Sequence, residues 1–391
     1  MRRIVKLELG VVLGLALVLT GCQYNGRPQA TSLTSGPAPE GSWEIGTGFQ
    51  YSQEPIWGDT LVGLEFSPVA SEQHIVVYDL NKRTKVRTID LPEGRMINPP
   101  SIYGNKIVFD AADREEYIRI MASSKLEAPP NSDIFLYDLD TNRMRQLTDE
   151  QHGQMSPRIY GDVVVWLDAR NQQLDRYPPS LDVYALDLKT NKETRITANT
   201  TAEGYTQLSI SGSTIVWADM RHADATVTNH GSNDFRYNNE IYAYDLATGR
   251  EQRLTDSPGN DWGPDIDGNR VVWIRQADYQ KADVFTRDLK TGEETQVSHS
   301  GYADSVVSID GDRVVWTDAS SSQGNTSNDV IMNGIQPGSA IVMTDLLTGK
   351  ETQLTPAEAG KVWLWPVSQG GHIVFEWNRQ IGGVAYAMDL P

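Results

Sequence analysis

The feature that most constrains this chain of 391 residues is a short turn motif that recurs seven times. Each copy centres on a glycine, and the glycines are Gly58, Gly104, Gly161, Gly212, Gly268, Gly311 and Gly370. Five residues after them stand Gly63, Phe109, Trp166, Trp217, Trp273, Trp316 and Phe375, so six of the seven copies carry an aromatic residue there. The mean spacing is about 52 residues, a period typical of a repeat architecture.

A second marker lies in each copy, an aspartate followed by a polar turn. These aspartates are Asp79, Asp138, Asp187, Asp245, Asp288, Asp345 and Asp389. We expect them to accept hydrogen bonds from the amides of the turn and to have no other role. The aromatic residue alternates with the turn along its strand, which favours packing between repeats over ligand binding.

The clearest copy spans residues 240–274 and contains β-branched and aromatic runs separated by turn residues, a pattern that favours hairpins over helices. The expected strands are Ile241–Leu246, Glu251–Leu254, Pro264–Ile266 and Val271–Trp273. Four short strands in a unit of this period predict an all-β fold, a seven-bladed β-propeller of four-stranded antiparallel blades.

The repeats resemble those of the TolB-type, WD40-like propeller family. The residues that carry the resemblance are Tyr244–Thr255, Asp261–Pro264 and Val164–Arg170, and the likeness runs from Trp43 to the end of the chain. TolB itself has six blades behind a small α/β domain, whereas this sequence has seven units and no such domain. The resemblance implies a relative of the family module that serves the bacterial cell envelope.

The N-terminus predicts a lipoprotein signal peptide over residues 1–21. Arg2, Arg3 and Lys6 precede an apolar run, Leu9–Leu19, that is too short to span a bilayer. Cys22, the sole cysteine, follows Thr-Gly as in a bacterial lipobox and is the expected lipid acceptor. The alternative is an ordinary secretory signal with an incidental cysteine. Residues 22–42 are rich in Pro, Gly, Ser and Thr and predict a flexible tether, with the propeller over 43–391.

The net charge of the chain limits the kinds of partner that it can bind. The formal net charge is −18, and it becomes −20 once residues 1–21, with three basic residues and one acidic residue, are removed. Such acidity argues against nucleic acid, which requires a basic surface. We expect an extracytoplasmic monomer, held to a bacterial membrane at the cell surface or in the periplasm through its lipid anchor only.

The two ends of the chain predict how the ring closes. The chain stops at Pro391 after a third strand, Val384–Leu390. In the other repeats, the apolar residue of the fourth strand precedes the next turn glycine by a nearly constant number of residues. Ile45 precedes Gly58 by nearly the same number. We therefore expect Trp43–Ile45 to supply the missing outer strand of the last blade, which would pair an open edge. The alternative assigns Trp43 to the tether.

Nearly all variation in repeat length lies between the second and third strands. The long connections are residues 111–132, 218–239 and 318–339, the first with a short helix expected around 116–126. In a propeller these connections share one face with the links between blades, a face that we call the insertion face. Insertions confined to one face are typical of a binding face.

Charged and aromatic residues near the insertion face are the candidate ligand or partner contacts. They are Asp168, Arg170, Asp219, Arg221, His222, Trp262, Arg275, Asp318 and Trp363. One hypothesis is a charged rim that binds a polar ligand, with aromatic faces for sugar rings or peptide. The other is structural: ion pairs between blades for the charged residues and packing of the innermost strands for the tryptophans.

Function follows less directly than fold. The sequence contains no phosphate-binding Gly-Lys loop, Gly-x-Ser-x-Gly elbow or His-Glu-x-x-His motif, and its histidines match no metal-binding spacing. We predict a non-enzymatic binding module for an envelope protein or polysaccharide, with no cofactor and no metal. The alternative is a polysaccharide lyase or glycoside hydrolase of propeller architecture, which would bring two carboxylates, or a histidine and a carboxylate, together in one pocket.

Overall fold

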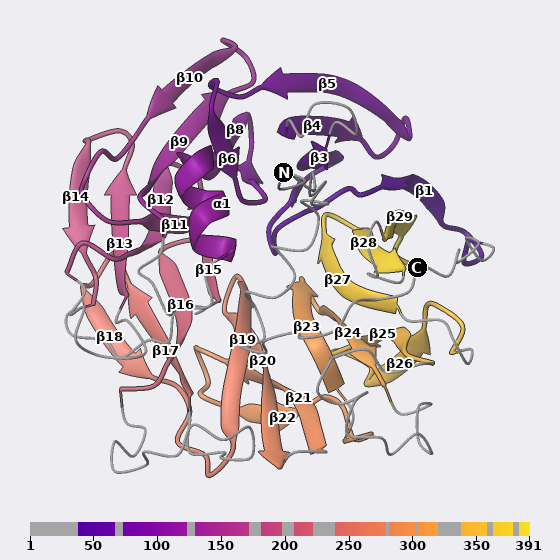
Figure 1. Ribbon diagram of the computed structural model, residues 1–391. Helices are drawn as coiled ribbons and strands as arrows, with labels where there is room; N and C mark the ends of the chain where they lie inside the picture. The colour runs from indigo at the N-terminus through magenta and orange to yellow at the C-terminus, as the bar shows by residue number, and fades with distance from the viewer. Residues whose placement is uncertain are drawn as a thin grey trace, which may run out of the picture.

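The protein is a seven-bladed β-propeller, as a computed structural model shows (Figure 1). The structure describes residues 38–66, 73–122, 130–171, 181–197, 207–221, 239–278, 281–301, 303–319, 338–357, 363–377 and 383–391. The expected signal peptide, Cys22 and most of the expected tether lie outside these residues. Within them, no helix has the length and apolar character needed to cross a membrane.

Each blade is an antiparallel sheet whose strands follow one another from the axis outward. Blade 1 contains β2 (Ile56–Trp57), β3 (Thr60–Phe66), β4 (Gln73–Asp79) and β5 (Thr84–Asp90); blade 2 contains β6 (Arg95–Ile97) and β7 (Ser101–Tyr103), both paired with β8 (Lys106–Asp113), then β9 (Ser132–Asp138) and β10 (Arg143–Gln146). Blade 3 contains β11 (Gln154–Tyr160), β12 (Val163–Asp168), β13 (Asp182–Asp187) and β14 (Lys192–Arg195); blade 4 contains β15 (Leu208–Ser211), β16 (Thr214–Asp219), β17 (Glu240–Asp245) and β18 (Arg250–Arg253).

The remaining blades repeat this order. Blade 5 contains β19 (Asn260–Asp267), β20 (Arg270–Asp278), β21 (Lys281–Asp288) and β22 (Glu294–Gln296); blade 6 contains β23 (Ala303–Asp310), β24 (Arg313–Asp318), β25 (Ala340–Asp345) and β26 (Lys350–Gln353). Blade 7 contains β27 (Trp363–Gln369), β28 (His372–Trp377), β29 (Val384–Asp389) and β1 (Trp43–Thr47). A helix, α1 (Arg114–Ala122), follows β8 at the position where the sequence predicted a short helix.

The predicted closure of the ring is confirmed. The N-terminal strand β1 pairs antiparallel with β29, with Trp43 opposite Ala387 and Thr47 opposite Val384. Blade 7 is therefore built from both ends of the chain, and β29 has no open edge. The guanidinium of Arg83 in blade 1 lies 4.3 Å from the centre of the Trp43 ring, so the closing strand also contacts the first blade.

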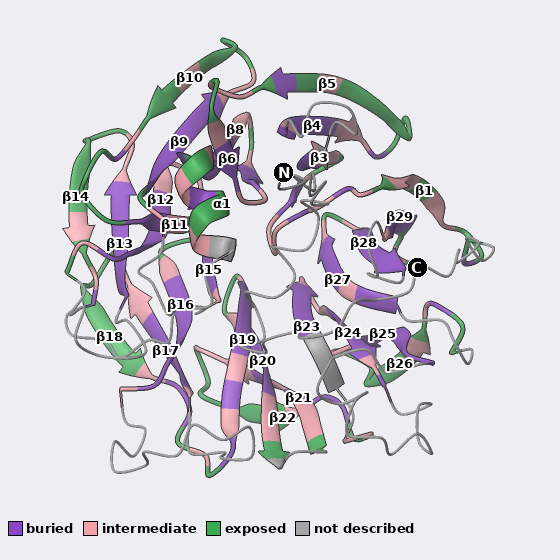
Figure 2. Cartoon of the chain, in the orientation of Figure 1, coloured by how far each residue is buried: buried purple, intermediate pink, exposed green. Residues whose placement is uncertain are grey.

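The inner strands of the blades are mostly buried, while outer strands such as β10, β14 and β18 are largely exposed (Figure 2). The core lies between the blades, and the aromatic residues of the second strands fill it as predicted. Trp166 packs against residues of blades 2 and 3, and Trp217 against residues of blades 3 and 4. Both indoles are fully buried. The predicted turn aspartates are also confirmed in six blades; Asp187, for example, accepts the amides of Lys189 and Thr190 at 2.8 and 2.9 Å.

Blade 1 is the one copy that has a glycine, Gly63, where the others have an aromatic residue, and the structure shows why. The ring of Phe49, which precedes β2, fills the space between blades 7 and 1. A Cβ atom on Gly63 would lie 2.3 Å from this ring and 2.6 Å from the backbone oxygen of Gln50. Gly63 is therefore required, because the aromatic side chain is supplied by the segment before the blade.

Candidate functional site

The innermost strands bring a ring of polar side chains together around the propeller axis. Asp265 of β19 accepts a hydrogen bond from the Ile309 amide of blade 6 at 3.0 Å, and its other oxygen lies 2.8 Å from the Ser209 hydroxyl of blade 4. Ser308 of blade 6 accepts the Ser368 amide of blade 7 at 3.2 Å. These bonds satisfy amides on the inner edges of strands that have no further strand beside them.

Glu54 crosses the axis. It precedes β2 of blade 1, yet its carboxyl group lies 2.9 Å from the Ser209 hydroxyl and 3.3 Å from the Ile210 amide of blade 4. Its backbone carbonyl accepts the Ile102 amide of blade 2, and nearby Tyr51 donates to the Trp365 carbonyl of blade 7 at 2.8 Å. The segment between β1 and β2 thus ties three other blades together at the centre of the ring.

The Ser209 hydroxyl forces Glu54 and Asp265 to share a proton. A hydroxyl donates one hydrogen, but the Ser209 oxygen lies within hydrogen-bonding distance of both carboxyl groups. Asp265 accepts two further backbone amides, those of Ile266 at 2.9 Å and Ile309 at 3.0 Å, which favours its ionised form. Burial raises the pKa of Asp265 as well, but these two amides oppose that shift, so we place the proton on Glu54, where burial raises the pKa from 4.5 to about 7.

Two more buried ionisable groups complete this axial cluster. Burial raises the pKa of Asp110 to about 6, although its carboxylate accepts hydrogen bonds from the Asn98 amide group at 2.6 Å and the Ser156 backbone at 3.1 Å. Burial lowers the pKa of Arg158, and the charges of Glu54, Asp265 and Asp110 oppose that shift. The Nη1 of Arg158 donates to the Pro157 carbonyl at 3.0 Å, while its Nε has no partner among the described residues.

The charged residues predicted at the ends of the second strands form pairs within single blades. In blade 3, Arg170 donates to Asp168 through Nε at 2.9 Å and Nη2 at 2.7 Å, and it reaches Glu193 of the outer strand at 2.9 Å. Asp168 also accepts the Nε1 hydrogen of Trp166 at 2.8 Å. Burial alone would lower the pKa of Arg170, but its bonds to Asp168 and Glu193 raise it above the usual value.

Blade 4 repeats the arrangement with Arg221, Asp219 and Glu251. Arg221 donates to Asp219 at 2.9 and 2.6 Å and to Glu251 at 2.8 Å, and its guanidinium lies 4.4 Å from the centre of the Tyr242 ring. The pairs run outward along one sheet, whereas the structural hypothesis expected ion pairs between blades. Both arginines are therefore already bonded on two sides.

Blade 5 uses the same chemistry with the residues exchanged. Arg275 stands on β20 where blades 3 and 4 have aspartate, and it donates to Asp261 of β19 at 2.8 and 3.0 Å and to Glu294 of β22 at 2.7 Å. The buried Nε1 of Trp273 has no hydrogen-bond partner among the described residues, and the same holds for Trp316 of blade 6. Blade 5 therefore departs from the pattern that blades 3 and 4 share.

The structure does not gather the other predicted site residues at one place. Trp363 is only 1% exposed; its ring packs against Phe375 and Tyr386 and donates to the Pro356 carbonyl at 3.1 Å, so it is a core residue. Trp262 is half-buried against the core between blades 5 and 6. Asp318 ends β24, opposite Ala340. His222 lies outside the described residues. No cluster of metal-ligating side chains occurs in the described part of the chain.

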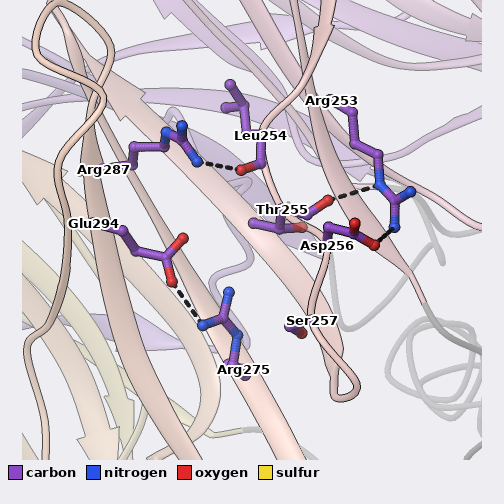
Figure 3. A pocket seen from close by; sticks show the side chains of 8 residues that line it. All are labelled: Arg253, Leu254, Thr255, Asp256, Ser257, Arg275, Arg287 and Glu294. Carbon is purple, nitrogen blue, oxygen red and sulfur yellow. Dashed lines mark hydrogen bonds and ion pairs between the residues drawn. The ribbon is translucent and has the colours of Figure 1, made fainter.

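A polar groove between blades 4 and 5 is a site that the sequence did not suggest. It encloses about 390 Å³, and its walls include Arg253 and Thr255 from the blade 4 side and Arg275, Arg287 and Glu294 from blade 5 (Figure 3). Arg253 is paired with Glu240 at 2.9 Å and Asp256 at 2.7 Å. Arg287 donates to the backbone carbonyl of Leu254.

A regular signal could have found the axial cluster. The residues three positions before the turn glycines are Pro55, Ser101, Arg158, Ser209, Asp265, Ser308 and Val367. Five of these seven are polar, at a fixed distance from the turn, which favours side chains directed at a polar axis. Glu54 stands one residue earlier and gives no such signal, because its role depends on blade 4.

Comparison with known proteins supports the fold and not a family. No protein-family model matches the sequence, and no curated protein matches it. Among solved structures, the propeller domain of the Trilobed protease from Pyrococcus furiosus is similar with a TM-score of 0.57 and 13% identity over 89% of this chain and 97% of that one. An oligogalacturonate lyase in complex with manganese is similar with a TM-score of 0.55 and 12% identity over 89% and 92%.

TolB is a weaker match. TolB from Acinetobacter baumannii is similar with a TM-score of 0.36 and 14% identity over 84% of this chain and 79% of that one. A score this low supports no relationship. The expected TolB-type membership is therefore not established, and the shared property of these neighbours is the β-propeller.

Proposed function

We propose that the protein is a lipid-anchored, extracytoplasmic binding module for an envelope protein or polysaccharide, and that it binds its partner through the insertion face without catalysing a reaction. Cys22 is the proposed anchor. The fold alone does not give this function, because propellers serve many unrelated roles.

The observation that carries the proposal is that the carboxyl groups that lie close together leave no room for a substrate between them. Glu54 and Asp265 are the closest analogue of a catalytic pair, but the Ser209 hydroxyl fills the space between them. A glycoside hydrolase needs a sugar between its two carboxyl groups. Asp168 and Asp219 face the insertion side but are fully buried under Arg170 and Arg221. These acidic residues therefore stabilise the propeller, and we infer that its surface binds the partner.

Helix α1 gives the insertion face a described surface feature. Tyr117 is buried against Met96 and Ala112, which fixes the helix to blade 2, while Ile118 is 39% exposed. Exposed apolar side chains fit a protein partner better than a polysaccharide. On the opposite face, Leu347 in the turn after β25 is 72% exposed and offers a matched control.

The test compares two single variants of the full-length chain, Ile118→Glu and Leu347→Glu. Each adds one negative charge at an exposed apolar position, so neither should alter folding. After cross-linking in intact cells, we expect Ile118→Glu to lower the yield of the cross-linked partner several-fold and Leu347→Glu to leave it unchanged. The reverse pattern would place binding on the other face. Depolymerisation of an envelope polysaccharide by the purified protein would favour the lyase or hydrolase alternative.

The anchor is tested separately. Cys22→Ser should release the processed protein from the membrane fraction, because no helix in the described residues can span a bilayer. The processed form must be resolved from a form that retains the signal peptide. Sedimentation of the processed variant with membranes at high salt would contradict the lipid anchor.

A further inference from the structure

Blade 5 differs from the other six blades in ways that converge on the groove between blades 4 and 5. Two residues after the buried tryptophan, blades 3, 4 and 6 carry Asp168, Asp219 and Asp318, whereas blade 5 carries Arg275. Before the turn aspartate, the other six blades carry Tyr78, Tyr137, Leu186, Tyr244, Thr344 and Met388, whereas blade 5 carries Arg287. Both arginines line the groove.

The repeat itself shows that a blade can form without an arginine at the position of Arg287. Six blades form the same sheet with an uncharged residue at the position of Arg287. Arg275 has a structural role, because it pairs with the fully buried carboxylate of Asp261 at 2.8 Å. Arg287 pairs with no carboxylate among the described residues, and a departure from a local rule with little structural gain is expected at a functional site.

Arg287 is the arginine in the groove whose guanidinium still has N–H donors for a ligand. Arg253 and Arg275 each pair with two carboxylates. Among the described residues, Arg287 bonds only to the backbone oxygen of Leu254, through Nη1, and pairs with no carboxylate. Its other N–H groups are available donors, in a chain whose net charge is −18. A guanidinium with spare donors binds carboxylate or phosphate through two parallel hydrogen bonds.

The rest of the groove suits hydroxyl groups. Its volume of about 390 Å³ lies within the range of small-molecule sites. Glu294 and Asp256 border it with carboxylate oxygens, which accept hydrogen bonds from hydroxyls but repel a second anionic group. Figure 3 shows Arg287 and Arg275 on one side of the groove and Asp256 on the other.

We propose that the groove between blades 4 and 5 is a binding site for an anionic sugar, with Arg287 holding the carboxylate or phosphate and the acidic residues holding the hydroxyls. The groove includes the link between blades 4 and 5 and therefore borders the insertion face. It would take a small ligand, so the proposal does not depend on the partner proposed above. A sugar acid and a phosphorylated sugar share the chemistry that the groove recognises, and the experiment distinguishes them.

The experiment is calorimetric titration of the purified full-length protein with four probes: glucuronate, glucose 6-phosphate, glucose and inorganic phosphate. We expect one or both anionic sugars to bind and glucose to show no binding. The variant Arg287→Tyr, which restores the residue of three other blades, should weaken binding by roughly tenfold or more, as expected for losing a charge-assisted hydrogen bond. It should keep the thermal stability of the parent protein.

A matched control removes the same charge elsewhere. Arg143→Gln lies on the outer strand of blade 2, where Arg143 is exposed, and it should bind as the parent protein does. Preference for glucuronate identifies a carboxylate site, and preference for glucose 6-phosphate a phosphate site. Equal binding by Arg287→Tyr, equal binding of glucose, or tighter binding of inorganic phosphate than of either sugar would overturn the proposal.

Discussion

Glu54→Gln tests the shared proton at the propeller axis. Glu54 is half-buried, and desolvation of its carboxyl group raises its pKa from 4.5 to about 7. Between these two pH values, the folded protein keeps a proton that the unfolded chain has released. The free energy of unfolding should therefore fall as the pH rises from 4.5 to 7, and change no further from this group above pH 7.

The size of the effect follows from the shift. One pKa unit corresponds to 1.36 kcal/mol, so Glu54 should lower the free energy of unfolding by about 3 kcal/mol across this interval. Glutamine has nearly the same shape as the protonated acid, keeps a donor for Ser209 and does not titrate. The variant should match the parent protein near pH 4.5 and exceed it by up to about 3 kcal/mol at pH 8.

The assay is the melting temperature of both proteins at half-unit steps from pH 4.5 to 8.5. Comparing variant with parent isolates Glu54, because every other group titrates in both. Asp110→Asn is the control: the pKa of Asp110 is raised only to about 6, so the divergence of this variant from the parent should be complete at a lower pH. Parallel profiles for Glu54→Gln and the parent protein would refute the shared proton.

Three further predictions concern stability. Arg170→Ala should destabilise the protein by about 3–5 kcal/mol in chemical denaturation, because it leaves the fully buried carboxylate of Asp168 without its partner; a loss below 1 kcal/mol would contradict this. Gly63→Ala should lower the melting temperature sharply, since its methyl group would lie 2.6 Å from the Gln50 backbone oxygen, and an unchanged melt would show that this contact relaxes freely. A chain truncated to start at Thr47 loses β1 and should melt earlier and associate on size exclusion, whereas one truncated to start at Gly41 should do neither.

The departures from the repeat are the most informative positions of this sequence. Every blade solves the same folding problem, so each serves as a control for the others. Gly63 departs for a structural reason, because Phe49 supplies the missing ring. Arg275 departs together with Asp261, the buried acid that it holds, whereas Arg287 departs without a carboxylate partner among the described residues. Both line the same groove. Comparing the blades therefore distinguishes residues that every blade needs in order to fold from residues that are present in one blade only.

The sequence by itself determined the blades. Turn glycines, turn aspartates and buried tryptophans act within one hairpin or between neighbouring blades, so their spacing repeats with the chain and can be counted. The same reasoning predicted closure by Trp43–Ile45, because the last repeat lacked a fourth strand and the N-terminal segment offered one; the strand in the structure runs from Trp43 to Thr47. The rim residues were placed at the ends of the correct strands, but their partners were not, since the choice between partners depends on where long side chains reach.

Only the tertiary structure decided what lies at the axis and between blades 4 and 5. Glu54 contacts Ser209, 155 positions later in the chain, and Ser209 contacts Asp265 on the following blade. No local pattern encodes these distances, because they depend on the radius of the closed ring and on the path of the segment before β2. The protonation of Glu54 also depends on closure of the ring. Closure places the carboxyl group of Glu54 beside a second carboxylate and away from water, and both effects favour the protonated form.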